Sequence, residues 1–241
     1  MSVAPPVEPG LLEREGPFIF VKSQFQGPPG WEGNRYKISR MAKSVQGVRY
    51  AELDRETSET HIKVVLDLDG GSRRDIVTGI GFFDHMLELF AFLGQIDIGL
   101  GSEGDLEVDD HHTVEDTGIV LGKAIREALD AGDAIERYSS VHVPMDDALV
   151  LVAMDISGRG QLHWEVPFAR EKVGDLSTEN IREFFRALTA HSGITLHVRK
   201  MAGHNDHHLC EAVFKAFGLA LDQATRLTPS RSSNSTKGKQ D

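Results

Sequence analysis

A six-residue pattern of metal-binding residue types occurs twice in this chain, 96 residues apart, and the fold has to accommodate both copies. The first copy reads Asp-His-His-Thr-Val-Glu over residues 110–115, and the second reads Asp-His-His-Leu-Cys-Glu over residues 206–211. On a helix, each glutamate shares a face with the histidines three and four residues before it. Neighbouring imidazoles project about 100° apart on a helix, so they cannot easily hold one ion together. The doubled pattern therefore predicts two metal ions, each bound by residues from both copies or from neighbouring chains.

The sequence around the two copies also repeats. Residues 96–100 align with residues 194–198 at an offset of 98, and the helical stretches that precede them also superpose. A loop two residues shorter brings the offset to 96, which places Gly122 on Gly218. Small insertions between matching elements belong in loops. We therefore predict an internal duplication with halves at about residues 47–137 and 138–228.

Each half has the pattern of strands followed by helices. Residues 61–69 alternate apolar and polar, and residues 148–154 form a continuous apolar run, so both are predicted strands. Helical spacing covers residues 82–93, 114–129, 177–191 and 209–224, and Ser177 with Asn180 offers N-cap chemistry. The predicted fold class is α+β: a duplicated βββαβα unit with two four-stranded sheets, each covered on one face by helices.

The two ends of the chain differ from its middle. Six of the nine prolines lie in the first 30 residues, so residues 1–46 are predicted to be a flexible Pro/Gly-rich extension. This stretch lacks the apolar region of a secretory signal. Residues 229–241 are rich in Ser, Thr and Lys and are predicted to be a tail.

Composition narrows the classes of protein. The formal net charge of −11 argues against a nucleic-acid-binding protein, which would show a basic surface. No apolar run approaches the ~20 residues of a membrane span. The single cysteine, Cys210, excludes an internal disulfide and makes a reducing cytoplasm the expected location. Cys210 itself is expected to be a small buried residue of the second motif helix.

Two further residues extend the set of possible metal ligands. His85 starts a predicted helix, and its counterpart under the duplication is Glu183. Both residue types bind divalent ions, and imidazole with carboxylate suits manganese, iron or zinc. The predicted ligand set contains eight residues: His85, His111, His112, Glu115, Glu183, His207, His208 and Glu211.

With these residues in place, the chain resembles the imidazoleglycerol-phosphate dehydratase family of histidine biosynthesis. The resemblance covers about residues 48–238. The matching segments are RETSET at 55–60, GFFDHM at 81–86, DDHHTVED at 109–116, SGR at 157–159, HNDHHLCEAVFKAF at 204–217 and STKG at 235–238.

This resemblance implies an enzyme, a carbon–oxygen lyase that converts imidazole glycerol phosphate to imidazole acetol phosphate. It also implies a homo-oligomer of 24 subunits with two manganese ions per active site. Glu59 falls on the family's acid–base glutamate, and Asp146 falls on a further active-site acid. The positions on the phosphate side of the substrate match Arg137, Arg159, Lys215, Thr236 and Lys237.

The chain departs from the family pattern at three positions. Glu183 stands where the family commonly has a histidine ligand, so an additional negative charge is expected at one ion. Leu89 and Leu93 stand where many members carry glutamine and histidine toward the phosphate.

Two other functions remain open from the residues alone. A dinuclear metallohydrolase would act on a phosphate ester, because such His/Glu sites also activate water. A metal-stabilised assembly without catalysis would have ions whose coordination is closed. Release of inorganic phosphate distinguishes the hydrolase from the dehydratase.

Overall fold

The computed structural model describes residues 49–130 and 134–228, together with three short strands before them. These strands are β1 (Arg14–Glu15), β2 (Phe18–Lys22) and β3 (Tyr36–Ile38), which pair antiparallel in a sheet of their own. The sequence did not lead us to expect strands there. The rest of the predicted extension, residues 1–46, and the predicted tail, residues 229–241, fall outside the described residues, as do Thr236 and Lys237.

Two four-stranded sheets with the same topology make up the body of the protein. The first half contains β4 (Tyr50–Glu56), β5 (Thr60–Asp67), β6 (Arg74–Val77), α1 (Gly81–Leu93), β7 (Asp97–Gly104) and α2 (His111–Leu129). The second half contains β8 (Tyr138–Met145), β9 (Ala148–Ile156), β10 (Gln161–Glu165), β11 (Lys172–Val173), β12 (Leu176–Ser177), α3 (Thr178–Ser192), β13 (Ile194–Ala202) and α4 (Asp206–Thr225). The strand orders, β4-β5-β7-β6 and β8-β9-β13-β10, correspond strand for strand. The predicted α+β class is confirmed, and the β11–β12 pair is an insertion specific to the second half.

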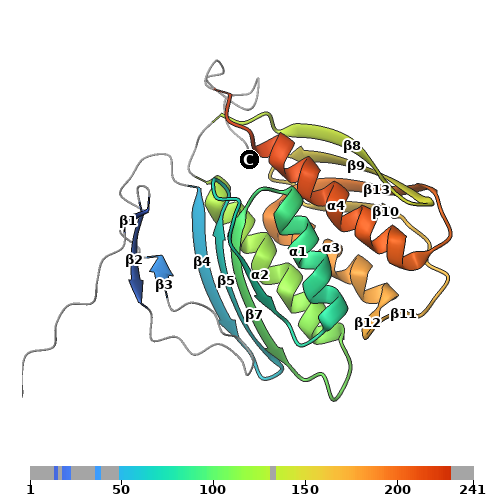
Figure 1. The fold of residues 1–241 in the computed structure, drawn as a ribbon, viewed down its shortest axis with the longest axis horizontal. Coiled ribbons are helices and arrows are strands. Elements are labelled where there is room, and N and C mark those ends of the chain that lie inside the picture. The colour runs from blue at the N-terminus through green and yellow to red at the C-terminus, as the bar shows by residue number, and fades with distance from the viewer. Residues whose placement is uncertain (1–13, 16–17, 23–35, 39–48, 131–133, 229–241) are drawn as a thin grey trace, which may run out of the picture.

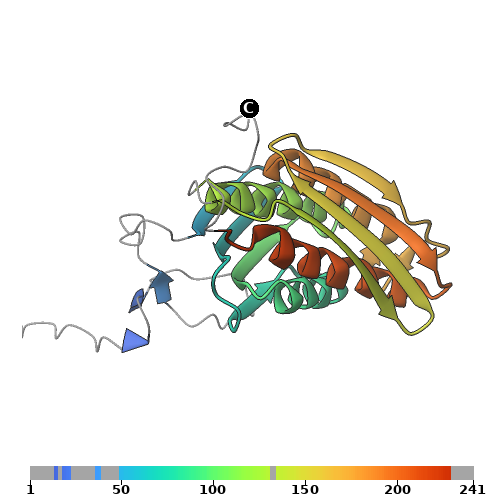
Figure 2. The ribbon, with the colours of Figure 1, turned by 90° about the horizontal axis from the view of Figure 1, so that it is seen from above.

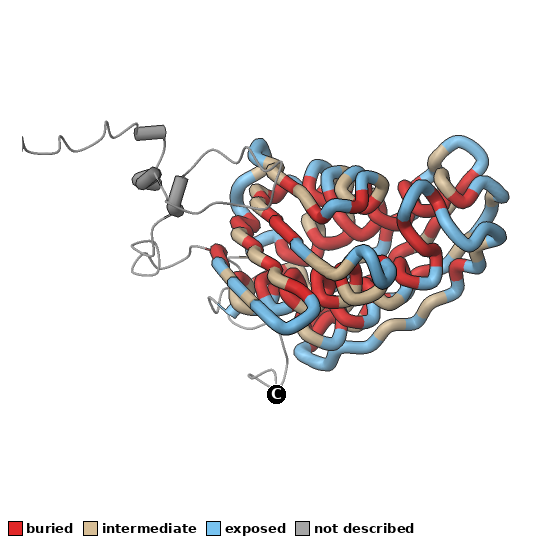
Figure 3. Tube along the Cα trace, turned by 90° about the horizontal axis from the view of Figure 1, so that it is seen from below, coloured by how far each residue is buried: buried red, intermediate tan, exposed pale blue. Residues whose placement is uncertain are grey.

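The sheets form the outer layers and the helices lie between them (Figures 1 and 2). Helices α1 and α2 pack on the first sheet, and α3 and α4 pack on the second. Along β5 and β9, buried residues alternate with partly exposed ones, so each sheet turns one face to the helices (Figure 3). Each sheet therefore contributes one apolar face to a core that both halves share.

Each helix packs against a helix of the other half, α1 against α4 and α2 against α3. Glycines allow equally close approaches in both pairs. A Cβ atom on Gly122 would lie 2.5 Å from the carbonyl oxygen of Leu188, and one on Gly218 would lie 2.4 Å from that of Phe90. Because Gly122 and Gly218 are the aligned glycines of the sequence repeat, the same contact occurs once in each helix pair.

Some details of the helix starts differ from the prediction. Helices α2 and α4 begin at His111 and Asp206, three residues before the predicted 114 and 209, so the polar motif residues are helical. The Asn205 side chain caps α4 by accepting hydrogen bonds from two backbone N–H groups. Ser177 occupies the N-cap position of α3, but the expected side-chain cap is wrong. Its hydroxyl donates instead to Oδ1 of the buried Asp110, at 2.7 Å.

Two smaller expectations can be compared with the structure. Cys210 is buried in α4, as predicted, and burial raises the pKa of its thiol above the ordinary value. In the described part of the chain, no helix combines the length and the apolar character that crossing a membrane requires.

Candidate active site

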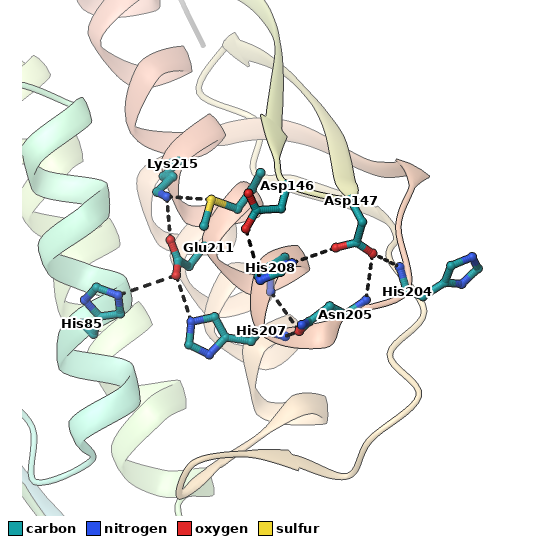
Figure 4. A network of polar contacts seen from close by, with 10 residues as sticks. His85, Asp146, Asp147, His204, Asn205, His207, His208, Glu211 and Lys215 are labelled. Carbon is teal, nitrogen blue, oxygen red and sulfur yellow. Dashed lines mark hydrogen bonds and ion pairs between the residues drawn. The ribbon is translucent and has the colours of Figure 1, made fainter.

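The α1–α4 pair places the helix start of the first half beside the motif of the second (Figure 4). At its centre is the Glu211 carboxylate, which contacts His207 Nε2 at 2.9 Å and Lys215 Nζ at 2.5 Å. His85 Nε2 lies 3.9 Å from the same Glu211 oxygen that contacts His207. We call His85, His207, His208 and Glu211 the α1–α4 half-site.

The α2–α3 pair repeats this arrangement with different partners. His111 Nε2 lies 3.3 Å from Oε2 of Glu115, four residues later on the same helix. The Arg186 guanidinium contacts Glu115 Oε1 at 2.5 Å and also pairs with Glu183. Glu115 and Glu183 therefore share one cation, and His111, His112, Glu115 and Glu183 form the α2–α3 half-site.

The second histidine of each motif contacts a carboxylate through its Nδ1 atom. His208 Nδ1 lies 2.7 Å from Asp147 Oδ1, and His112 Nδ1 lies 3.0 Å from Asp105 Oδ2. The hydrogen bond with Asp105 raises the pKa of His112 above its ordinary value, and the nearby charge of Glu59 adds to this shift. In the α2–α3 half-site, His111 Nδ1 also lies 3.0 Å from Asn180 Oδ1.

The two predicted catalytic acids occupy corresponding hairpins. Glu59 lies in the exposed turn between β4 and β5, and Asp146 lies in the exposed turn between β8 and β9. Asp146 has a left-handed backbone with φ of 48°, which aspartate tolerates in tight hairpins. Its Oδ2 atom is 3.4 Å from His208 Nε2. Each acid thus lies near the second histidine of its own half.

Hydrogen bonds keep two carboxylates of this region ionised. Burial alone would raise the pKa of Glu211, but the contacts with Lys215 and His207 outweigh it, so the pKa lies below the ordinary value. Asp147 accepts backbone hydrogen bonds from His204 and Asn205 and a side-chain bond from His208, which together lower its pKa. The site therefore presents charged acceptors to a cation.

The predicted phosphate-binding residues are only partly near the half-sites. Lys215 lies in the α1–α4 half-site region, one helical turn from Glu211. The backbone N–H of Arg137 donates to the Ala224 carbonyl near the far end of α4, which is about 25 Å from His207 along the helix. The guanidinium of Arg137 forms a two-point ion pair with Asp155, at 2.7 and 3.2 Å.

Arg159 is exposed in the loop after β9, and the next residue, Gly160, lies against Thr189 near the C-terminal end of α3. The Arg159 carbonyl accepts a hydrogen bond from Thr195 at the start of β13. Leu89 and Leu93, which depart from the family pattern, are partly buried on α1, where Leu89 packs against the core. Thr236 and Lys237 remain predictions.

The residue types fit a divalent metal, but the described part of one chain does not complete a site. Imidazole nitrogens and carboxylate oxygens suit manganese, iron or zinc. Within residues 49–130 and 134–228, however, no three His, Cys, Asp or Glu side chains converge closely enough to hold an ion. Each half-site is thus an incomplete set of suitable donors on the surface of the chain.

Sequence reasoning missed four polar residues that organise this region. Asp105, Asp147 and Asn180 each contact a motif histidine, and Arg186 connects the two carboxylates of the α2–α3 half-site. Asp147 follows Asp146 directly, so a second acid in the same turn was a usable signal. Arg186 lies three residues after Glu183 on α3, so its helical spacing was a second usable signal. Asp105 and Asn180 are separated from their partners by a loop or by a different helix, so spacing alone could not find them.

Comparison with known proteins connects this geometry to one family. The model of the family described as imidazoleglycerol-phosphate dehydratase matches residues 78–221. A relative of that name from Cereibacter sphaeroides is 53% identical over 193 residues, covering 79% of this chain and 99% of the relative. Another from Acetivibrio thermocellus is 54% identical over 178 residues, covering 74% of this chain and 91% of the relative.

Solved structures agree with the sequence relatives. The imidazoleglycerol-phosphate dehydratase of Staphylococcus aureus superposes with a TM-score of 0.68 at 37% identity, covering 74% of this chain and 99% of that one. The Pyrococcus furiosus protein, solved in complex with (S)-C348, also gives 0.68 at 37% identity, covering 77% and 99%. With more than half of the chain matched by the family model, this chain belongs to the imidazoleglycerol-phosphate dehydratase family, the hydro-lyases of histidine biosynthesis.

Proposed function

We propose that this chain dehydrates imidazole glycerol phosphate to imidazole acetol phosphate with two manganese ions, at active sites shared by neighbouring chains of a large homo-oligomer, 24 subunits by family likeness. One observation supports this most strongly. Two half-sites of His and Glu side chains stand at equivalent places in the fold, and neither is complete within the described residues. A half-site of one chain facing the other half-site of a neighbour would supply the missing donors.

Different residues of the chain would bind the metal ions and transfer the proton. Bound divalent ions would act as Lewis acids and as a template for the imidazole ring of the substrate. Glu59 is exposed in its hairpin, and its carboxylate would take a proton from the substrate carbon. Asp146 stands in the corresponding hairpin of the other half, beside His208. A site assembled from both halves would bring both acids to the substrate.

The phosphate group would be held by basic residues. Lys215 is paired with Glu211 at present. A metal ion on Glu211 would leave this ammonium group to the phosphate. Arg137 and Arg159 carry guanidinium groups, which bind phosphate oxygens in pairs. Because Arg137 is about 25 Å from His207 along α4, it would serve the active site of a different chain or a different half-site.

A product assay on metal-depleted protein tests the chemistry. Imidazole glycerol phosphate is supplied with manganese, zinc or magnesium, and both imidazole acetol phosphate and inorganic phosphate are measured. We expect dehydration that depends on manganese, without phosphate release. Phosphate release would identify a phosphate-ester hydrolase, and metal binding with neither product would identify a non-catalytic assembly.

Particle size tests the shared site. Metal bound between chains would also stabilise the assembly, since its binding free energy is linked to association. Light scattering should therefore show a smaller particle after chelation and recovery of the large particle with manganese. An unchanged particle without any metal would contradict sites shared between chains.

A further inference from the structure

We infer that Asp147 and Asp105 are positioning residues that set the tautomer of His208 and His112, so that each imidazole turns an unprotonated Nε2 atom toward a metal ion. This inference rests on the proposed metal-dependent function. It concerns residues that lie outside the predicted ligand set.

The argument begins with the hydrogen-bonding capacity of the groups. An ionised carboxylate can only accept hydrogen bonds, so an imidazole nitrogen in contact with it has to carry the hydrogen. His208 Nδ1 lies 2.7 Å from Asp147 Oδ1, and His112 Nδ1 lies 3.0 Å from Asp105 Oδ2. In a neutral ring the second nitrogen then has the free lone pair. In both histidines that nitrogen is Nε2. In His208 the Nε2 atom also lies 3.4 Å from Asp146 Oδ2, but the contact at Nδ1 is much shorter, 2.7 Å, so it decides where the ring hydrogen resides.

Asp105 and Asp147 do not occupy equivalent positions in the two halves. Asp105 follows β7, whereas Asp147 lies in the β8–β9 hairpin, and the two are 42 residues apart rather than 96 or 98. The duplication therefore did not place them. Two unrelated positions supply the same contact to the same atom of equivalent histidines, which favours a shared requirement over coincidence. Metal-binding histidines commonly donate their other ring nitrogen to a carboxylate in this way.

Asp147 is itself held in place. Its Oδ2 atom accepts hydrogen bonds from the backbone N–H groups of His204 and Asn205, at 2.7 and 3.2 Å, which leaves Oδ1 for His208 (Figure 4). Among the described residues, the Asp105 carboxylate accepts no backbone hydrogen bond. This difference makes the two positions respond differently to the same substitution.

At position 147, asparagine should be as harmful as alanine. The single oxygen of an Asp147→Asn amide would be occupied by the two backbone N–H groups, so its NH2 group would face His208. That group would donate to Nδ1, shift the ring hydrogen to Nε2 and obstruct the metal. We expect manganese affinity to fall by about 10–100-fold in both Asp147→Asn and Asp147→Ala.

At position 105, asparagine should be tolerated. An Asp105→Asn amide can turn its oxygen to His112 Nδ1 and preserve the tautomer. We expect Asp105→Asn to retain most of the manganese affinity, and Asp105→Ala to lose about 10–100-fold. Asp97→Asn is the matched control, because Asp97 also holds a loop through backbone N–H groups but lies away from the motif histidines.

The measurement is manganese titration of metal-depleted full-length protein by calorimetry, with thermal unfolding of the same metal-depleted samples. A loss of manganese affinity in Asp147→Asn without a matching loss of thermal stability supports the inference. A purely structural role would instead make Asp147→Asn milder than Asp147→Ala in both manganese affinity and thermal stability. Wild-type affinity in Asp147→Asn would overturn the inference while leaving metal dependence standing. A wild-type protein that binds no divalent ion would overturn the metal proposal itself.

Discussion

In the α1–α4 half-site one carboxylate, Glu211, is surrounded by two imidazoles and the ammonium group of Lys215. In the α2–α3 half-site two carboxylates, Glu115 and Glu183, share the guanidinium of Arg186. With neutral imidazoles, the first group of charges cancels and the second retains one negative charge. Corresponding helix pairs thus carry different electrostatics, because one ligand position holds histidine in one half and glutamate in the other.

This difference suggests what the duplication preserves and what it leaves free. The glycine contacts, the helix pairing and the hairpins recur in both halves, and they set where a side chain can be placed. The charge at each place depends on single residues, which can change without disturbing the packing. The following substitutions test how far the halves are equivalent, beginning with the largest expected effect.

The largest effect is expected on turnover, from the acids of the β4–β5 and β8–β9 hairpins. Glu59→Gln keeps the size of the side chain and removes its basicity, so we expect turnover to fall by about 10²–10⁴-fold with metal content unchanged. Asp146→Asn, measured in the same dehydration assay, shows whether the second hairpin contributes equally. Glu56→Gln, on the neighbouring strand, is the control. Wild-type turnover in Glu59→Gln would show that Glu59 is a loop residue without a catalytic role.

The two helix pairs should respond alike to a change in packing. Gly122→Ala and Gly218→Ala each force a methyl group against a carbonyl oxygen of the partner helix. We expect each to lower the free energy of unfolding by about 1–3 kcal/mol, measured by denaturant titration without metal. Gly81→Ala is the control, because nothing lies within 4 Å of its added Cβ atom. A normal stability in only one of the two variants would break the structural equivalence.

The two helix-start ligands should affect different ions. If Glu183 is a ligand, Glu183→Ala removes a direct bond and a compensating charge, so one of two manganese ions should bind more weakly, on the order of tenfold or more. Glu183→His should be tolerated, and His85→Ala reports on the opposite half-site. Two ions bound with full affinity in Glu183→Ala would assign Glu183 to the solvated surface of α3.

The smallest effect is expected at Arg186. Its side chain is 52% exposed, so Arg186→Gln should change the free energy of unfolding by about 0.2–1 kcal/mol at most. The same change removes a cation that competes for Glu115 and Glu183, so manganese should bind more tightly in calorimetry. Arg199→Gln, which breaks an exposed ion pair with Glu165 elsewhere, is the control. A weaker manganese affinity would instead make Arg186 a support for the ligands.

Most of the fold could be predicted because burial leaves a regular trace in the sequence. The alternation in β5 and the apolar run of β9 reflect one sheet face against helices, and aligned repeats gave the same element order twice. The β11–β12 pair was missed because two-residue strands carry no periodicity. The starts of α2 and α4 were placed three residues too late because the polar residues of their first turns do not continue the apolar periodicity.

The candidate site was predictable in its residue types but not in its pairing. The sequence showed eight possible ligands, and the resemblance assigned them to a family. It did not show that His85 lies beside Glu211, or that Glu183 and Glu115 share Arg186, because crosswise helix packing depends on tertiary contacts. Ser177 illustrates the same limit, since its hydroxyl bonds a distant buried carboxylate instead of its own helix.

The incomplete half-sites have a genetic consequence. If each active site joins the α1–α4 half-site of one chain to the α2–α3 half-site of another, a chain inactivated by Glu211→Ala still carries an intact α2–α3 half-site. A chain inactivated by Glu115→Ala carries an intact α1–α4 half-site. Co-expressed in one cell, these two defective alleles would complement each other, because mixed particles contain some sites built entirely from the undamaged halves. Histidine-independent growth from two inactive copies would then be a property of the assembly that neither polypeptide possesses.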